Sequence, residues 1–189
     1  YNKIMSEENF FVNKFLYFQE KNQEDYFYNS LIYIFEHNAN GALGIVVNKV
    51  IPISENIIFK SLNIDTDKER KNLLNGGPVD MNKLFVIHDQ TDQAESLNVE
   101  QGLSLTSSLD VLENIGKGTF KGPYRLALGY CGWDGGQLDT EVNKNSWLIV
   151  DIPSNIVFQE DPNDLVKRIS KEVGFDIDKI QNSEIITKH

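Results

Sequence analysis

The sequence contains little cysteine and little histidine, and it has no long hydrophobic run. Its single cysteine, Cys131, excludes an intrachain disulfide and a cysteine-rich zinc site. No apolar stretch approaches the roughly 20 residues that a helix needs to span a bilayer. The first residues also lack the apolar core of a secretory signal peptide. We therefore expect a cytoplasmic protein that does not associate with a membrane.

Clusters of basic residues are also missing. The formal net charge is −10 at pH 7, and the isoelectric point is about 4.7. The densest basic stretches, residues 68–71 and 167–168, are interrupted or flanked by acidic residues. Because the phosphate backbone of nucleic acids is bound mainly by clustered lysine and arginine, we expect no direct contact with nucleic acid.

The composition is that of an ordinary globular protein, with 189 residues of which 40% are hydrophobic. No repeat or low-complexity linker divides the chain, so we expect residues 1–189 to form a single domain. Residues 31–35 are apolar at every position, which is typical of a strand covered on both faces. The turn-forming pair Asn40 and Gly41 separates this strand from a return strand at 44–48, which predicts a central hairpin.

Further elements follow from hydrophobic spacing and capping residues. A helix over 54–62 begins at Ser54, and another opens at 107–110 and ends at Gly116. Asp161, Pro162 and Gly174 delimit the last helix. We expect another short helix at 136–142 and strands at 83–88, 103–105, 124–129, 147–150 and 156–158. Strands and helices alternate irregularly, which favours a mixed α+β or three-layer α/β domain.

Three segments combine glycines with polar side chains in otherwise apolar surroundings: residues 36–44, 76–79 and 129–141. Glycine permits a tight turn or a close approach of the backbone to another group. Such a texture marks either backbone packing or a cleft. We expect these three segments to converge in space.

The same segments carry a resemblance to a known family. The matching blocks are residues 33–49, with the sequence EHNANGALG inside them, residues 76–88, and residues 128–148, which contain LGY, GW and GQL. In order and spacing they resemble the YqgE/AlgH family of bacterial proteins over roughly residues 10–175, most strongly over 30–150. The resemblance implies a bent mixed sheet approaching a barrel and flanked by helices. The family is mostly uncharacterised, and one branch carries a transcriptional-regulator label.

Two departures from the family pattern concern thiols. The family usually has cysteine at the position of Phe35, and a small residue at the position of Cys131. A thiol role at the first position therefore does not carry over to this chain. Cys131 has no sequence neighbour that would lower its pKa, so we expect a buried structural cysteine rather than a reactive one.

The convergence of the three segments selects the candidate residues for a cleft or binding surface. They are Glu36, His37, Asn38, Gly41, Asn48, Gly77, His88, Trp133, Gln137 and Glu141. His37 and His88 each follow an apolar strand and titrate near neutrality, but a histidine at a strand end is more often simply hydrogen-bonded. With His189 near the C-terminus, too few ligands with familiar spacing remain for a metal site, and we expect neither metal nor cofactor.

Gln137 and Glu141 lie four residues apart and share one helix face. Glu141 is a candidate general base if it is buried, whereas the structural alternative is that both side chains brace the glycine-rich loop by accepting from its N–H groups. The loop also offers N–H groups to an anion, but it has no following lysine and contains Asp134, so it is not a P-loop. The two tryptophans are expected to anchor core or loop.

Three hypotheses for function remain. The first is a non-enzymatic binding or regulatory protein that acts through a protein partner or a small ligand. The alternative is a hydrolase-like enzyme that uses His37 or His88 with Glu36 or Glu141 as an acid–base pair. In the third, the polar blocks specify the fold and nothing more. Contact between a histidine and a glutamate in an open pocket would favour the enzyme.

Overall fold

The computed structural model describes residues 11–66, 70–91, 93 and 95–179. His189 lies outside them. The strands are β1 Phe15–Phe18, β2 Leu31–Asn38, β3 Gly41–Val46, β4 Val50–Ser54, β5 Asn72–Asn75, β6 Val79–His88, β7 Ser96–Asn98, β8 Ser104–Thr106, β9 Tyr124–Asp134 and β10 Trp147–Val150. The helices are α1 Glu55–Ser61, α2 Leu109–Lys117, α3 Gln137–Asn143, α4 Ile156–Gln159 and α5 Leu165–Val173, with 3₁₀ turns η1 Pro162–Asp164 and η2 Ile177–Lys179.

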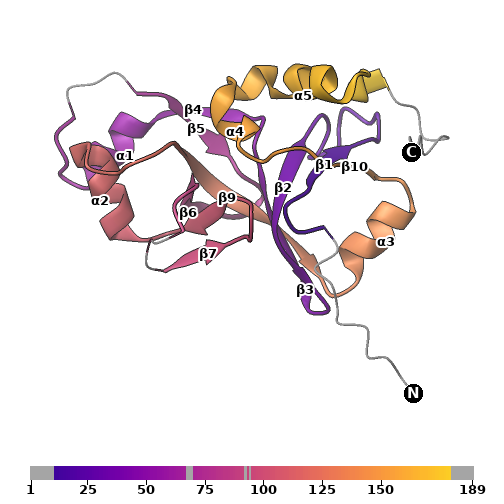
Figure 1. The fold of residues 1–189 in the computed structure, drawn as a ribbon, viewed down its shortest axis with the longest axis horizontal. Coiled ribbons are helices and arrows are strands. Elements are labelled where there is room, and N and C mark those ends of the chain that lie inside the picture. Colours follow the sequence, from indigo (N-terminus) through magenta and orange to yellow (C-terminus); the bar gives the residue numbers. More distant parts are fainter. Residues whose placement is uncertain (1–10, 67–69, 92, 94, 180–189) are drawn as a thin grey trace.

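One curled sheet organises the molecule. Its strands follow the order β10-β1-β2-β3-β9-β6-β8-β7, and β5 adds to β9 in parallel while β4 pairs with β5. The other pairings are antiparallel, so the sheet is mixed. The long strand β9 runs from the side of α1 and α2 to the tip of β3 (Figure 1), and its two halves have different partners. This arrangement confirms the expected single α+β domain with a bent sheet flanked by helices.

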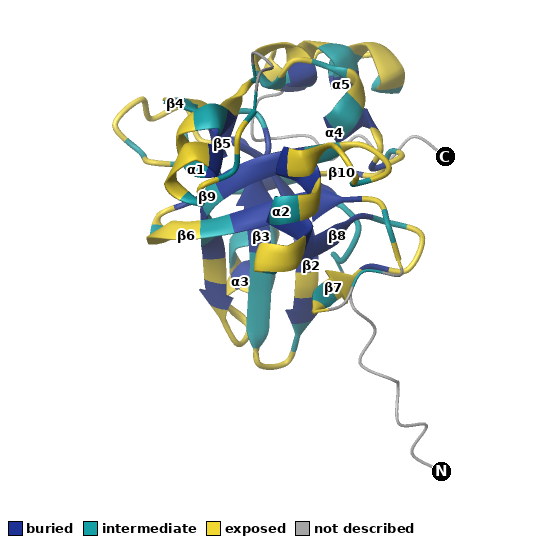
Figure 2. Cartoon of the chain, turned by 90° about the vertical axis from the view of Figure 1, so that its left-hand side faces the viewer, coloured by how far each residue is buried: buried dark blue, intermediate teal, exposed yellow. Residues whose placement is uncertain are grey.

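The middle of the sheet is buried on both faces. Along β2, Tyr33 belongs to a core cluster that includes Leu165 and Ile169 of α5. Ile32 and Ile34 belong to a second cluster on the opposite face, beneath α3. A third cluster lies under α1 and α2. Figure 2 shows the buried strands at the centre and the exposed outer surfaces of the helices. The prediction of a strand covered on both faces is confirmed.

Several local predictions are confirmed by the backbone. The expected hairpin is present: Asn38 pairs with Gly41, so the two turn residues are Ala39 and Asn40, and Gly41 begins β3 rather than belonging to the turn. The Ser54 side chain accepts from the Asn56 amide and caps α1. Asp161 caps η1, which continues into α5 and ends at Gly174 in the left-handed region.

Other predictions are wrong. Residues 156–158 form the start of α4 rather than a strand, since the run is short and its apolar positions reach the core equally well as a single helical turn. Helix α2 continues past Gly116, which packs against Phe59 and Ile64, and ends at Gly118 with a φ of 75°. The strand expected at 124–129 continues to Asp134 through the glycine-rich segment. Strands β1, β4, β5 and β7 were not expected.

Candidate functional site

The three glycine-rich segments lie side by side, as the sequence predicts. Gly44 pairs with Cys131 across β3 and β9. The Val46 amide donates to the carbonyl of Gly76 at 2.9 Å, and the Gly76 amide donates to the Leu128 carbonyl at 2.8 Å. The turn before β6 is therefore pinned between β3 and β9.

The glycines at this junction permit close backbone packing. A Cβ on Gly77 would overlap the carbonyl group of Tyr130, and a Cβ on Gly41 would overlap the carbonyl oxygen of Trp133. Both glycines have positive φ, at 155° and 145° respectively. Backbone occupies the space at these positions, so their lack of side chains has a structural explanation and does not require a ligand.

Glu141 connects the two tryptophans of the chain. Its Oε2 accepts from the indole nitrogen of Trp133 at 3.0 Å and from that of Trp147 at 2.8 Å. Its Oε1 accepts from Gln137 Nε2 at 3.1 Å, and Gln137 Oε1 accepts from the Asp134 amide at 3.0 Å. Gln137 therefore braces the loop, as the structural alternative predicts. Glu141 accepts hydrogen bonds from side chains and not from the N–H groups of the loop.

His37 is buried at the end of β2, with 2% of its surface exposed. Its Nε2 lies 3.2 Å from Asp139 Oδ2 on α3, and its ring stacks on Phe11 at 5.1 Å between centroids. Asp139 is not one of the two glutamates named in the acid–base alternative. The contact ties α3 to the β2–β3 hairpin.

His88 is fully buried at the end of β6. Its Nε2 lies 3.0 Å from the hydroxyl of Ser96 on β7, and its Nδ1 accepts from the Gln90 amide at 3.1 Å. The ring meets Phe120 edge-on. This histidine joins β6 to β7 through its contact with Ser96.

The exposed end of the hairpin carries two further candidates. Asn38 accepts from the Asn40 amide at 2.8 Å and donates to Glu36 Oε1 at 3.2 Å, so it shapes the turn. Glu36 lines a hollow of about 580 Å³ together with Glu100 and Leu97. Two carboxylates at this hollow make it unsuited to an anionic ligand.

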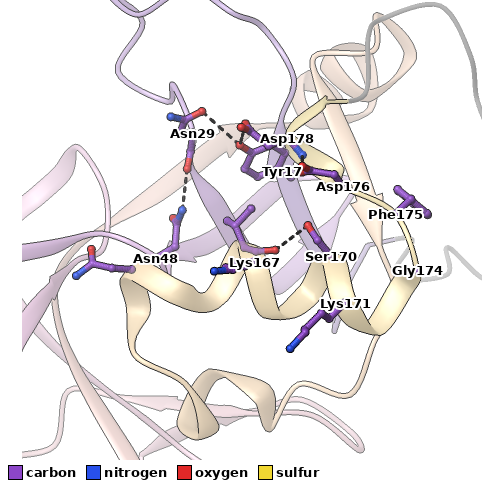
Figure 3. A pocket seen from close by; sticks show the side chains of 12 residues that line it. Tyr17, Asn29, Asn48, Lys167, Ser170, Lys171, Gly174, Phe175, Asp176 and Asp178 are labelled. Carbon is purple, nitrogen blue, oxygen red and sulfur yellow. Dashed lines mark hydrogen bonds between the residues drawn. The ribbon is translucent and has the colours of Figure 1, made fainter.

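Asn48 is the candidate that lies beside a large cavity. We call this cavity the α5 groove. It has a volume of about 820 Å³ and lies between α5 with the turn that follows it and the ends of β1, β2 and β3 (Figure 3). Its lining residues are Tyr17, Asn29, Asn48, Asn163, Val166, Lys167, Ser170, Lys171, Gly174, Phe175, Asp176 and Asp178.

A chain of hydrogen bonds forms one wall of the α5 groove. Asn48 Oδ1 accepts from the Leu31 amide at 2.8 Å, and its Nδ2 donates to the Asn29 carbonyl at 2.7 Å. The Tyr17 hydroxyl donates to Asp178 Oδ1 at 2.6 Å (Figure 3). Burial and this hydrogen bond raise the pKa of Tyr17, and the same bond lowers the pKa of Asp178. The wall is therefore a fixed structure that joins four distant segments.

The opposite side of the α5 groove carries unpaired positive charge. Lys167 and Lys171 are exposed on α5, and within the described residues neither ammonium group makes a hydrogen bond or ion pair. Val166 and Phe175 add apolar surface. Asn48 is among the candidates that the sequence predicts, but the other lining residues are not. Residues of β1 and α5 are far apart in the sequence and come together only when the chain is folded.

A model of the AlgH-like family matches residues 15–178 of this sequence. The chain belongs to the AlgH-like family. A UPF0301 protein from Dechloromonas aromatica is 37% identical over 155 residues, covering 79% of this chain and 82% of that protein. A UPF0301 protein from Methylococcus capsulatus is 36% identical over 178 residues, covering 91% and 94%.

Solved structures confirm the AlgH-like fold. The solution structure of the AlgH protein from Pseudomonas aeruginosa aligns with a TM-score of 0.74 at 28% identity, covering 87% of this chain and 89% of that one. A crystal structure of a protein from Corynebacterium diphtheriae aligns with a TM-score of 0.59 at 19% identity, covering 87% and 90%, and supports the fold alone. These matches confirm the family and the architecture that the sequence resemblance implied.

The thiol departures of this AlgH-like chain have a clear structural setting. Phe35 is 2% exposed and packs edge-on against Tyr33 in the core. Cys131 is 1% exposed, and its thiol donates to the Gly76 carbonyl at 3.5 Å. Burial raises the pKa of Cys131 to about 12. The expectation that Cys131 is buried is confirmed.

Neither a metal-binding cluster nor a membrane-spanning helix occurs among the described residues. Within them, no group of three or more histidine, cysteine, aspartate or glutamate side chains is arranged to hold a metal ion. Over the same part of the chain, no helix is long and apolar enough to cross a membrane.

Proposed function

We propose that this AlgH-like chain is a non-enzymatic binding protein whose ligand is a small organic anion held in the α5 groove. The observation that supports this proposal most directly is the size and lining of the α5 groove. Its volume of about 820 Å³ lies within the range typical of small-molecule sites. It also combines apolar surface with a few fixed polar groups.

The charges of the α5 groove favour an acidic ligand. Its two carboxylates already have partners: Asp178 binds Tyr17 and Lys21, and Asp176 lies 3.7 Å from Lys179. The two lysines on α5 have none within the described residues, so an anionic group can neutralise them without displacing an existing contact. Val166 and Phe175 would contact the apolar body of the ligand.

The histidine environments favour binding over the hydrolase-like alternative. A general base must reach the proton that it abstracts. His37 and His88 are buried, and they line neither the α5 groove nor the hollow beside Glu36. Among the described residues, Asp139 lies within 3.2 Å of His37 and the Ser96 hydroxyl within 3.0 Å of His88. A regulatory role through a protein partner is compatible with the proposal, and with a net charge of −10 we expect it to involve no direct contact with DNA.

The proposal is tested with 1-anilinonaphthalene-8-sulfonate, an aromatic sulfonate that has both the charge and the apolar body required. Titration into ¹⁵N-labelled protein should shift the amides of Val166, Ser170 and Phe175 and the side-chain amide of Asn48. The double variant Lys167→Glu/Lys171→Glu should weaken binding by about tenfold or more, because two attractive charges become repulsive.

The matched control is Lys60→Glu/Lys144→Glu, which makes the same change in net charge at exposed lysines outside the α5 groove. It should bind the probe as the wild type does. Equal binding by both double variants, or shifts confined to other parts of the protein, would refute the proposal.

A further inference from the structure

A second cavity lies at the other end of the molecule from the α3 helix, where α1, α2, α4 and the start of β9 meet. It has a volume of about 440 Å³, and we call it the arginine cavity. Its charged and aromatic lining comprises Glu55, Arg70, Lys71, Phe120, Tyr124, Arg125 and Phe158. Arg70 and Lys71 belong to one of the densest basic stretches of an otherwise acidic sequence.

Arg70 is largely but not fully buried, and its hydrogen bonding is incomplete. Its side chain is 11% exposed and stacks on the ring of Phe59 at 4.6 Å. Nη1 donates to the Tyr124 hydroxyl at 3.0 Å, and Nη2 reaches the Gly116 carbonyl only at 3.4 Å. Nε is buried and has no partner among the described residues. A guanidinium can donate five hydrogen bonds, so much of its capacity is unused.

The nearest carboxylate compensates Arg70 only in part. Glu55 Oε2 accepts from the Tyr124 hydroxyl at 2.9 Å but lies 3.9 Å from Arg70 Nη1, beyond hydrogen-bonding distance. Burial raises the pKa of Glu55 despite the neighbouring arginines. This carboxylate is therefore held by the tyrosine rather than forming a bidentate pair with Arg70.

Arg125 is compensated only by carboxylates that do not contact it. Only 8% of its surface is exposed, and it donates from Nε to the Val157 carbonyl at 3.2 Å and from Nη2 to the Glu160 carbonyl at 2.9 Å. Both acceptors are neutral. Glu55 and Asp161 act on Arg125 electrostatically, but no carboxylate within the described residues forms an ion pair with it. Lys71 at the exposed rim also lacks an ion pair there. The lining thus carries three cations and one carboxylate.

We propose that the arginine cavity binds a small oxyanion, a phosphate or carboxylate group, between the guanidinium groups of Arg70 and Arg125, with Lys71 at the rim. A buried cation whose counter-charges lie beyond hydrogen-bonding distance is costly, and an oxyanion between the two guanidinium groups supplies both charge and acceptors. Arginine forks match the oxygens of carboxylate and phosphate, which gives the site its selectivity for these groups over chloride.

The test is a titration of ¹⁵N-labelled protein with inorganic phosphate and, separately, with succinate, at an ionic strength held constant with sodium chloride. The Nε–Hε resonances of Arg70 and Arg125 report on the arginine cavity directly. We expect saturable shifts with phosphate, with succinate, or with both, and the pattern identifies which oxyanion the cavity takes. Shifts that are linear and no larger than those caused by chloride would overturn the proposal.

Two variants separate binding from folding. Arg70→Lys keeps the charge and loses the fork, and it should weaken binding by about tenfold. Lys71→Ala changes an exposed rim residue that the fold does not need, and it should weaken binding by about threefold. Lys144→Ala changes an exposed lysine that does not line the arginine cavity, and as the matched control it should bind as the wild type does. Wild-type affinity in Lys71→Ala and in folded Arg70→Lys would refute the assignment.

Discussion

The Glu141 contact with two indoles provides the sharpest test of how polar groups stabilise this AlgH-like fold. Trp133 is 7% exposed and Trp147 is 3% exposed, so neither indole N–H can turn to bulk water. Both donate to the same carboxylate oxygen, at 3.0 and 2.8 Å. Glu141→Ala removes the acceptor and leaves two buried donors unsatisfied.

The cost follows from the desolvation of those donors. A buried group left without its partner costs about 1–3 kcal/mol, and hydrogen bonds to a charged acceptor lie toward the upper end. Because a water molecule can enter the space left by the side chain, we expect a combined loss of about 2–4 kcal/mol in the free energy of unfolding. For a chain of this length the melting temperature should fall by roughly 5–15 °C.

Urea denaturation followed by tryptophan fluorescence measures this loss at the site itself, because the sequence contains only 2 tryptophans and Glu141 binds both. Glu141→Gln keeps an oxygen acceptor without the charge and should lose about 1 kcal/mol. Glu113→Ala is the control, since its contact with Lys117 is an exposed pair at 4.0 Å. An alanine variant at Glu141 that unfolds within about 0.5 kcal/mol of the control would refute the reasoning.

Three further predictions follow from the same structure. Gly77→Ala should lower the free energy of unfolding by more than about 2 kcal/mol, because its Cβ would overlap the Tyr130 carbonyl. Gly118→Ala should lower it by about 1 kcal/mol, because a Cβ there would meet no atom within 4 Å and only the positive φ is unfavourable. Urea titration measures both. Cys131, with its pKa raised to about 12, should resist a disulfide reagent at about pH 8 in the native protein and react fully in denaturant. Burial raises the pKa of Glu55 above its ordinary 4.5, so the protonated group stabilises the fold below that pH, and this stability is lost as the pH rises through the folded pKa. The free energy of unfolding of Glu55→Gln, relative to that of the wild type, should therefore be higher at about pH 7 than at about pH 4, as measured by urea titration at both pH values.

The sequence predicts those elements that carry their own local signal. Ser54, Asp161 and Gly174 mark helix ends through caps that the structure contains. The all-apolar stretch of β2 indicates a doubly covered strand, since no one-sided sheet would need apolar residues at every position. These features depend on a few neighbouring residues, which is why a single sequence is sufficient to find them.

Elements without such a signal were missed. Strands β4 and β5 have mixed burial and depend on pairing with each other and with β9, so their extended conformation comes from tertiary contacts. The extension of β9 to Asp134 has the same origin, because pairing with β3 holds its glycines in the ladder. Local propensity would have ended the strand at Gly129.

The candidate site was predicted less well than the fold. Proximity of the three glycine-rich segments is confirmed, but Gly41 and Gly77 make room for carbonyl groups, and His37 and His88 join elements of the scaffold. Asn48 alone leads to the α5 groove. A sequence pattern cannot separate a glycine that faces a ligand from one that faces a neighbouring strand, because both require the same absence of a side chain.

The two cavities differ from the predicted junction in how their residues are arranged along the chain. Tyr17 and Lys171 line the α5 groove, and Arg70 and Arg125 line the arginine cavity, yet each pair is separated by more than 50 positions and neither belongs to a short motif. At the junction, in contrast, neighbouring polar groups satisfy one another. Binding requires groups whose hydrogen-bonding capacity or charge the fold leaves unused. The lysines of α5, which form no ion pair among the described residues, and the partly compensated arginines meet that condition. The dense polar motifs therefore maintain the curled sheet, while the capacity to bind a ligand is expected at sites that only the completed fold assembles.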